Sequence, residues 1–222
     1  MFSAHLVFGD INGHSRLPLR RRVDTLQTFW DICARHRPLA LANNAQSFYD
    51  LDNDCLMAGF SELNGLTQAM EVILWTVELS QQLAQAKVNV SFGVYLVSEA
   101  INWRTEMGYN ERAGEIHMPD DVYTMQGRVV RSRLAGDCLI VAKRLVELAK
   151  ASGLEIALAA RPGRYLGNDA HHLLRNLAVD EGVTIEEITD GLNALGRKKA
   201  AWLRSQDLHV FGLSFADQRA RG

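Results

Sequence analysis

The distribution of apolar and polar residues predicts strands and helices over most of the chain. Short apolar runs bounded by turn residues predict strands over His5–Ile11, Leu39–Tyr49, Asp54–Phe60, Val88–Leu96, Leu154–Ala160 and Leu208–Phe215. Apolar residues at helical spacing predict helices over Leu19–Arg37, Thr67–Ala86, Cys138–Ala151 and Asp169–Val179. The stretch Asn102–Gln126 is irregular and polar, so a loop or an insertion is expected there.

This order of elements predicts an α+β fold, with helices packed on a mostly antiparallel sheet. The strands Leu39–Tyr49 and Asp54–Phe60 flank the polar group Asp50–Asn53, which is typical of a β-hairpin with an acidic tip. The chain has no internal repeat, low-complexity tract or linker rich in Pro, Gly or Ser. Residues 1–222 are therefore expected to form one domain, with residues 161–222 as its α/β C-terminal part.

Composition narrows the class of protein. With 222 residues, 47% of them hydrophobic, the chain can build one good core. The near balance of 24 basic and 26 acidic residues gives no reason to expect a nucleic-acid partner. Cys33, Cys55 and Cys138 are too widely spaced for a metal cluster and suit a reducing compartment. We find neither a signal peptide nor a membrane span, so a cytoplasmic protein is expected.

Two acidic residues stand at positions suited to metal binding. Asp10 ends the first predicted strand, and Asp54 follows the predicted hairpin tip. If the hairpin pairs beside the first strand, both carboxylates meet at one end of the sheet. Two carboxylates facing a triphosphate provide the hard oxygen ligands that Mg²⁺ or Mn²⁺ requires. Isolated aspartates at such positions are, however, more often simple turn residues.

Three segments resemble the ordered motifs of class III adenylyl and guanylyl cyclases. LVFGDINGHS resembles the opening strand of that family, NDCLMAGF its second motif and GDCLIVAKRL its third. They occur in the family's order and at similar separation, within residues Ala4–Ala160. The resemblance implies a cyclase-like (ferredoxin-like) sheet and an enzyme that closes a nucleoside triphosphate into a 3′,5′-cyclic monophosphate.

The resemblance also implies roles for particular residues. Asp10 and Asp54 match the two metal-binding aspartates, and the backbone carbonyl of Ile11 would also reach a metal. Two Mn²⁺ or Mg²⁺ ions would activate the ribose 3′-hydroxyl for in-line attack. Arg144 matches the arginine that steadies the transition state. Because family members share their sites between two domains, a homodimer is implied, in which Arg144 acts on nucleotide held by the partner's Asp10 and the partner's Asp54.

The sequence departs from the family at residues that orient the sugar and read the base. Ile140 replaces the usual ribose-orienting asparagine, and isoleucine forms no side-chain hydrogen bond. Asp50 and Arg133 replace the adenine-reading pair of adenylyl cyclases. Their donors and acceptors suit uracil, cytosine or guanine better than adenine. Tyr49 either stacks on or borders a small base, or packs within the sheet.

A lone catalytic domain with such base-reading residues resembles the bacterial pyrimidine cyclases of the antiphage system called Pycsar. That likeness implies UTP as substrate, cyclic UMP as product and a separate cyclic-nucleotide-activated effector protein. The alternatives are a guanylate or cytidylate cyclase, or a non-catalytic nucleotide-binding domain. The basic run Arg197, Lys198 and Lys199 offers candidates for phosphate binding, or is an ordinary solvated surface.

Overall fold

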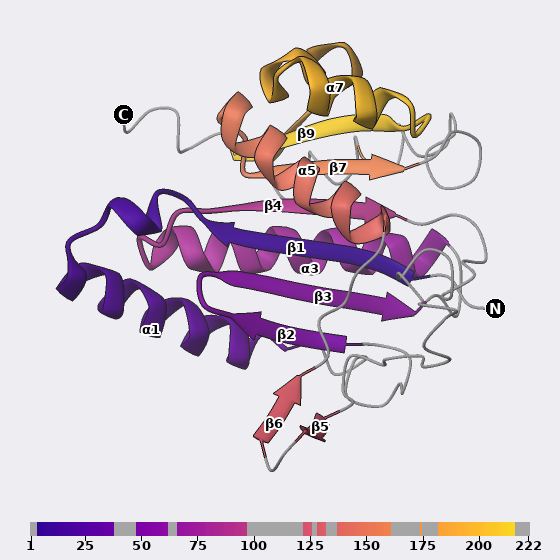
Figure 1. The fold of residues 1–222 in the computed structure, drawn as a ribbon. Helices are drawn as coiled ribbons and strands as arrows, with labels where there is room; N and C mark the ends of the chain where they lie inside the picture. The colour runs from indigo at the N-terminus through magenta and orange to yellow at the C-terminus, as the bar shows by residue number, and fades with distance from the viewer. Residues whose placement is uncertain are drawn as a thin grey trace.

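The structure is a computed structural model, and it describes residues 4–37, 48–61, 66–96, 122–125, 128–131, 137–160, 174 and 182–215. Its main element is a seven-stranded sheet with the order β2-β3-β1-β4-β7-β9-β8 (Figure 1). Neighbouring strands are antiparallel, except that β4 and β7 are parallel. The strands are β1 (Ala4–Ile11), β2 (Phe48–Asp52), β3 (Cys55–Ser61), β4 (Val90–Leu96), β7 (Ile156–Ala160), β8 (Val183–Glu187) and β9 (His209–Phe215). The expected α+β fold with a mostly antiparallel sheet is confirmed.

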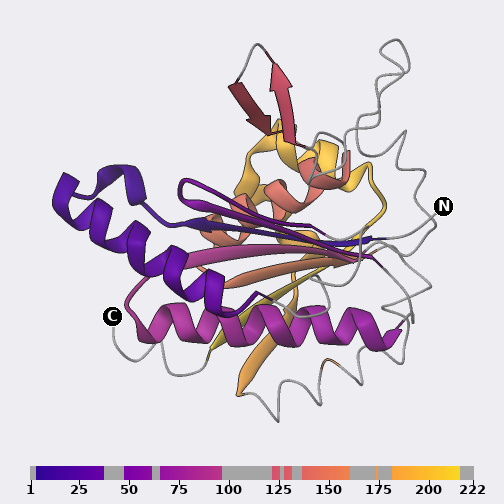
Figure 2. The same ribbon diagram turned by 90° about the horizontal axis from the view of Figure 1, so that it is seen from below.

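Helices cover both faces of this sheet, as the view from below shows (Figure 2). Helices α1 (Leu19–Arg35) and α3 (Leu66–Gln85) lie on one face, and helices α5 (Asp137–Ser152) and α7 (Arg197–Arg204) lie on the other. Two 3₁₀ helices, η1 (His14–Arg16) and η2 (Thr189–Leu195), follow β1 and precede α7. Strands β5 (Val122–Met125) and β6 (Arg128–Arg131) form a separate two-stranded hairpin.

Alternation along β1 divides the core into two layers. Val7 and Ile11 are buried in the layer of α1 and α3, whereas Leu6 is buried in the layer of α5 and α7. This is the two-residue period of a strand whose two faces are both covered. Asp10 has the parity of Leu6, so its carboxylate lies on the α5 side of the sheet.

Most predicted elements occur, with shifted ends. The strands of residues 5–11 and 208–215 and the helices of residues 19–37, 67–86 and 138–151 are confirmed to within a few residues. On α1 the predicted apolar stripe is only half right. Phe29 and Cys33 are buried, but Val23 and Trp30 are 54% and 42% exposed. The predicted helix over residues 169–179 lies outside the described residues, except that Leu174 is helical.

Several predictions of local structure were wrong. Asp50 is a strand residue of β2, paired with Met57, and not part of the hairpin tip. The turn consists of Asn53 and Asp54, with Asn53 at a φ of 53°. Short left-handed turns favour asparagine, which explains why the chain reverses there and not at Asp50. Strands β5, β6 and β8 and helix α7 were not predicted, because each is short and most residues of β8 and α7 are exposed.

Candidate functional site

Strand pairing brings the two predicted metal-binding aspartates to the same end of the sheet. Asp10 lies at the end of β1, opposite Cys55 of β3 and Ser91 of β4. Asp54 lies in the turn before β3, where its carbonyl oxygen accepts a hydrogen bond of 3.0 Å from the amide of Ile11. Trp30 of α1 fixes the same turn, since its Nε1 donates to the Asn53 carbonyl over 2.8 Å.

These residues form a small group of candidate metal ligands. One carboxylate oxygen each of Asp10 and Asp54 and the Sγ of Cys55 all lie within 4.8 Å of one another. Burial, followed by the negative charges of the two aspartates, raises the pKa of the Cys55 thiol to about 12. Hard divalent cations prefer oxygen to sulfur, so the carboxylates are the effective donors. Two half-buried carboxylates fit the hard-oxygen preference of Mg²⁺ and Mn²⁺.

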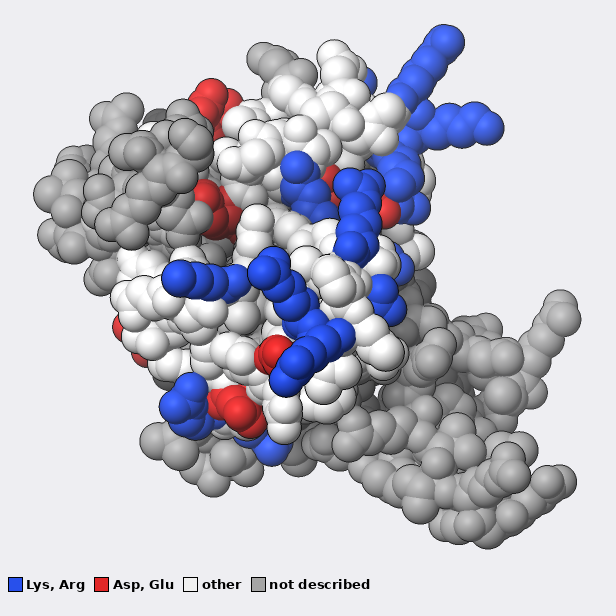
Figure 3. Space-filling model, turned by 90° about the vertical axis from the view of Figure 1, so that its left-hand side faces the viewer, with Lys and Arg blue, Asp and Glu red and all other residues white. Residues whose placement is uncertain are grey.

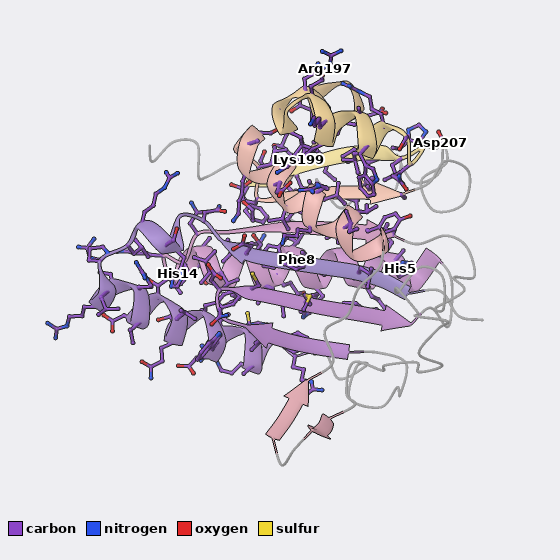
Figure 4. The ribbon with its side chains drawn as sticks, viewed as in Figure 1. His5, Phe8, His14, Arg197, Lys199 and Asp207 are labelled. Atoms are coloured by element: carbon purple, nitrogen blue, oxygen red, sulfur yellow. The ribbon has the colours of Figure 1, made fainter. Side chains whose placement is uncertain are left out.

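Each carboxylate also contacts a cationic or potentially cationic side chain. Lys150 Nζ lies 2.6 Å from Asp10 Oδ2, and His14 Nδ1 lies 3.3 Å from Asp54 Oδ2. The His14 ring is buried in the turn after β1 (Figure 4), and its Nε2 lies 3.3 Å from the carbonyl oxygen of Arg22. The sequence analysis assigned no role to either residue. Lys150 is 140 positions from Asp10, so only the tertiary fold reveals their contact.

Ile11 contributes to the site through its backbone. Its side chain is 3% exposed and lies in the core beneath α1 and α3. Its amide holds the turn that carries Asp54. The apolar side chain therefore anchors the end of β1, and any contact with a metal would come from the main chain.

Arg144 lies on α5 and is held by an acidic neighbour. Its Nη1 donates to both carboxylate oxygens of Glu147, at 2.8 and 2.6 Å. Lys199 of α7 lies 3.0 Å from the same carboxylate, on the side of α7 that faces α5 (Figure 4). Burial raises the pKa of Glu147, but hydrogen bonds from Arg144 and Lys199 outweigh it and lower the pKa below its ordinary value. Glu147 therefore remains a carboxylate that orients both cations.

Of the other predicted residues, the structure describes the side chains of Tyr49 and of the basic run on α7, and none of these belongs to the group of Asp10, Asp54 and Cys55. Arg197 and Lys198 are exposed on α7, together with Lys199. Tyr49 faces the core on the opposite side of the sheet, where its hydroxyl donates to the Cys33 carbonyl over 2.7 Å. Its ring meets Trp75 edge-on, with ring centroids 6.2 Å apart. Burial raises the pKa of Tyr49 well above its usual value. For Asp50 only the backbone position in β2 is described, and Arg133 lies outside the described residues.

A polar pocket of about 640 Å³ lies beside Lys150, the lysine that contacts Asp10, although neither aspartate lines it. Lys150 and Arg16 are the basic residues in its wall, and Glu155 is acidic. Asn12 spans the pocket floor, because its Nδ2 donates to Asn89 Oδ1 over 2.8 Å and to Ser91 Oγ over 2.9 Å. Figure 3 views the molecule from this end, where basic side chains lie over the surface with acidic ones between them. A pocket with this lining suits a polar, anionic ligand.

This chain has similar solved structures, but no protein-family model and no curated protein match its sequence. A bacterial light-regulated adenylyl cyclase is similar in structure, with 15% identity over 85% of each chain and a TM-score of 0.48. The guanylyl cyclase Cya2 is similar over 97% of this chain and 93% of its own, with 10% identity and a TM-score of 0.48.

A third similar structure is that of Vibrio cholerae LapD, S helix-GGDEF-EAL, bound to c-di-GMP. The two chains are 9% identical. The match covers 83% of this chain and 37% of the LapD chain, with a TM-score of 0.45. Likenesses with so few identities and such TM-scores leave the activity open. No described helix is both long and apolar enough to cross a membrane.

Proposed function

We propose that this chain is a divalent-metal-dependent nucleotide cyclase, which converts a nucleoside triphosphate into a 3′,5′-cyclic monophosphate and pyrophosphate. The observation that carries the proposal is the juxtaposition of Asp10 and Asp54 at one end of the sheet, next to a polar pocket. Both aspartates belong to sequence segments that resemble cyclase motifs. The resemblance and the geometry thus single out the same two residues by independent routes.

The proposed reaction is an intramolecular displacement at phosphorus. The ribose 3′-hydroxyl gives its proton to water, and the oxygen forms a bond to the α-phosphorus. The bond from that phosphorus to the oxygen bridging to the β-phosphate breaks, and pyrophosphate leaves. A bound Mg²⁺ or Mn²⁺ ion would supply positive charge that favours the deprotonated hydroxyl and the leaving group. Asp10 and Asp54 would hold that ion, and Lys150 and Arg16 would bind phosphate oxygens in the pocket.

We further propose that Arg144 completes the site of a partner subunit. Within the chain its guanidinium bonds Glu147, and its side chain is 28% exposed, so it is ordered and still accessible. A fixed guanidinium stabilises charge that grows on the phosphoryl oxygens in the transition state. Lys199, which shares Glu147, is the best placed of the three basic candidates to contact phosphate. Arg197 and Lys198 remain weaker candidates on the same helix.

Complementation tests this arrangement. A chain carrying Asp54→Ala and a chain carrying Arg144→Ala should each be inactive alone. Random mixing at a one-to-one ratio makes half of the dimers heterodimers, each with one intact site, so activity should recover to about a quarter of the wild-type value. No recovery at any ratio, with both variants folded and dimeric by light scattering, would contradict a shared site.

The proposed substrate is UTP and the proposed product cyclic UMP. Support comes from the hydrogen-bonding groups of Asp50 and Arg133, which also suit CTP and GTP. The contacts of Tyr49 favour its alternative role as a packing residue of the sheet. The likeness to pyrimidine cyclases further suggests a role in antiphage defence, through a cyclic-nucleotide-activated effector protein. We infer a single domain, because one sheet draws its strands from residues 4 to 215.

The direct experiment is to incubate the purified protein with Mn²⁺ and each of ATP, GTP, CTP and UTP in turn. Products are identified by mass spectrometry, with an Asp10→Asn, Asp54→Asn double variant as the control. Cyclic UMP formed by the wild type alone is the expected result. Formation of cyclic GMP or cyclic CMP would change the proposed nucleotide substrate, but the protein would still be a nucleotide cyclase. No cyclic product from any of the four nucleotides would count against a cyclase.

One observation favours a non-catalytic nucleotide-binding domain as the second candidate. Asp10, Asp54 and Arg144 each have a partner of opposite or complementary character within the chain, namely Lys150, His14 and Glu147. Ile140, in place of a ribose-orienting asparagine, is 42% exposed on the same helix as Arg144. Such a domain would bind a triphosphate, measured by calorimetry, and leave it unchanged over hours.

A further inference from the structure

Lys150 forms an ion pair with a candidate metal ligand, although its sequence position on α5 suggests an ordinary surface lysine. It lies in the last turn of α5, and its Nζ contacts Asp10 Oδ2 at 2.6 Å, with both side chains 29% exposed. The helix is held close to the sheet above this contact. A Cβ atom on Gly93 of β4 would lie only 2.1 Å from the carbonyl oxygen of Ala142, so glycine permits the approach. Packing therefore sets the distance between the α5 backbone and the sheet, and the Lys150 side chain spans the remaining distance to Asp10.

The contact restricts what Asp10 can coordinate. In a two-metal centre the ions lie about 3.5–4 Å apart, and a carboxylate that serves both gives one oxygen to each. Oδ2 of Asp10 already accepts from Lys150, so a metal ion at that oxygen would share it with the ammonium, whereas an ion at Oδ1 would not. Asp54 is similar, because its Oδ2 faces His14 Nδ1 at 3.3 Å. Each carboxylate thus has one oxygen turned toward a protein nitrogen.

Charge supports the same restriction. The two carboxylates carry two negative charges, and Lys150 returns one positive charge directly to Asp10. A second divalent ion near Oδ2 would meet an ammonium at close range, in a half-buried setting where water screens the repulsion incompletely. One divalent ion between Asp10 and Asp54 avoids that repulsion.

We propose that Lys150 serves as the second cation of this site, so that the chain binds one divalent ion where the sequence resemblance implies two. The proposal rests on the proposed function only in that it takes Asp10 and Asp54 as the metal ligands. Lys150 also lines the polar pocket with Arg16. An ammonium has three N–H donors, and Asp10 accepts from one of them, so the others can serve a phosphate oxygen. Lys150 would then join the metal ligands to the phosphate pocket.

The experiment is a titration of the full-length protein with Mn²⁺ alone, with free Mn²⁺ measured by electron paramagnetic resonance. The wild type should bind one Mn²⁺ per chain. Lys150→Met keeps the aliphatic stem but removes the charge. It should bind a second Mn²⁺, and the dissociation constant of the first should fall tenfold or more. Lys150→Arg retains the charge and should keep one ion.

Two variants serve as controls. Arg35→Met removes one positive charge from an exposed position on α1, on the other face of the sheet from Lys150, and should change the dissociation constant less than twofold. Lys150→Gln repeats the loss of charge with a polar side chain. It should behave as Lys150→Met does. Agreement between the two variants shows that the effect comes from the lost charge and not from the way methionine packs. Circular dichroism and thermal melting establish that each variant is folded.

Several outcomes overturn the proposal. Two Mn²⁺ ions per wild-type chain would do so. Equal stoichiometry and affinity in the wild type and in both charge-removing variants would do so too, as would no binding to any of them. These results are separate from those of the nucleotide assay. A wild type that makes a cyclic nucleotide but binds two ions keeps the function and loses the role of Lys150. If the wild type makes no cyclic product, but Lys150→Met binds a second Mn²⁺ ion, the proposed function is lost and the role of Lys150 is kept.

Discussion

The two faces of the sheet are packed by different kinds of residue. The face under α1 and α3 is filled by large apolar side chains, among them Phe29, Phe92 and Phe211, all with at most 2% exposure. The face under α5 and α7 also holds large side chains such as Leu6 and Tyr95, but small residues lie where α5 meets the sheet, including Ala142, Ala149, Ala157, Ala159 and Gly93. The charged residues Asp10, Lys150, Arg144 and Glu147 also belong to that face or to its helix.

The difference suggests that one face of the sheet contributes mainly to the stability of the fold, whereas the other positions the candidate site. Large side chains keep α1 and α3 away from the strands and remove much apolar area from water. Small side chains let α5 lie close to the strands, so that its last turn reaches the end of β1. Close packing of backbone on backbone fixes Lys150 relative to Asp10 more firmly than long side chains would. Substitutions on the two faces should therefore have different consequences.

The largest expected effect is the loss of activity when a ligand on the α5 face is removed. Asp10→Asn should lower kcat/KM for the proposed cyclisation on the order of 1000-fold, or about 4 kcal/mol, because the amide has lost the charge that holds a divalent ion. The free energy of unfolding should change by less than about 1 kcal/mol, since the Lys150 ion pair is partly exposed. Product formation and urea unfolding measure the two quantities. An active variant would remove Asp10 from the site.

The next effect is a loss of stability on the α1 face without a change in chemistry. Phe29→Ala should lower the free energy of unfolding by about 3–4 kcal/mol, because a fully buried ring leaves a cavity. Asp31→Ala, two positions later and exposed, should cost less than about 0.5 kcal/mol. Activity per folded molecule should stay near that of the wild type. A large fall in kcat for folded Phe29→Ala would show that the two faces are not independent.

A smaller effect is expected where the helix and the sheet approach most closely. Gly93→Ala should lower stability by about 3 kcal/mol, because the new methyl group meets the backbone of Ala142 and Val146. It should also strengthen Mn²⁺ binding, because a displaced α5 moves the Lys150 ammonium away from Asp10. Gly191→Ala is the control, since a methyl group there meets its nearest atom at 3.7 Å. Equal behaviour of the two variants would mean that α5 can move away without cost.

The smallest effect concerns a histidine on the otherwise apolar face. His5 pairs with Phe60 in the sheet (Figure 4), and burial lowers its pKa from 6.5 to about 4. Below pH 6.5 the unfolded chain takes up a proton at His5 that the folded chain does not. Stability should therefore fall as the pH drops from 6.5 toward 4, by about 2 kcal/mol at pH 5.

Urea unfolding at pH 7.5 and pH 5 checks this prediction. In His5→Phe the titrating group is gone, so the difference between the two pH values should be smaller by about 2 kcal/mol. An unchanged difference would show that other groups account for the acid sensitivity. The sign would be the opposite for a histidine whose pKa is raised by folding, for which acid would be stabilising.

Local pattern predicted the elements whose periodicity is strong. Residues 67–86 and 138–151 have long apolar stripes and are helices in the structure, as α3 and α5. Strands β5 and β6 escaped prediction because each has only four residues, and β8 did so because only Val183 of its five residues is buried. The exposure of Trp30 was also missed, because its indole serves the turn at Asn53 through a hydrogen bond that no helical period encodes.

For the candidate site, residue types and their order along the chain were sufficient to select Asp10, Asp54 and Arg144, and strand pairing then brought the two aspartates together. Lys150 and His14 could be found only in the tertiary structure. A carboxylate at a strand end is visible in sequence because turn position and motif identify it. An ion pair across 140 residues is not, because it depends on how closely α5 packs against the sheet. Sequence therefore determined which acids we propose as metal ligands, and packing decided which cations lie beside them.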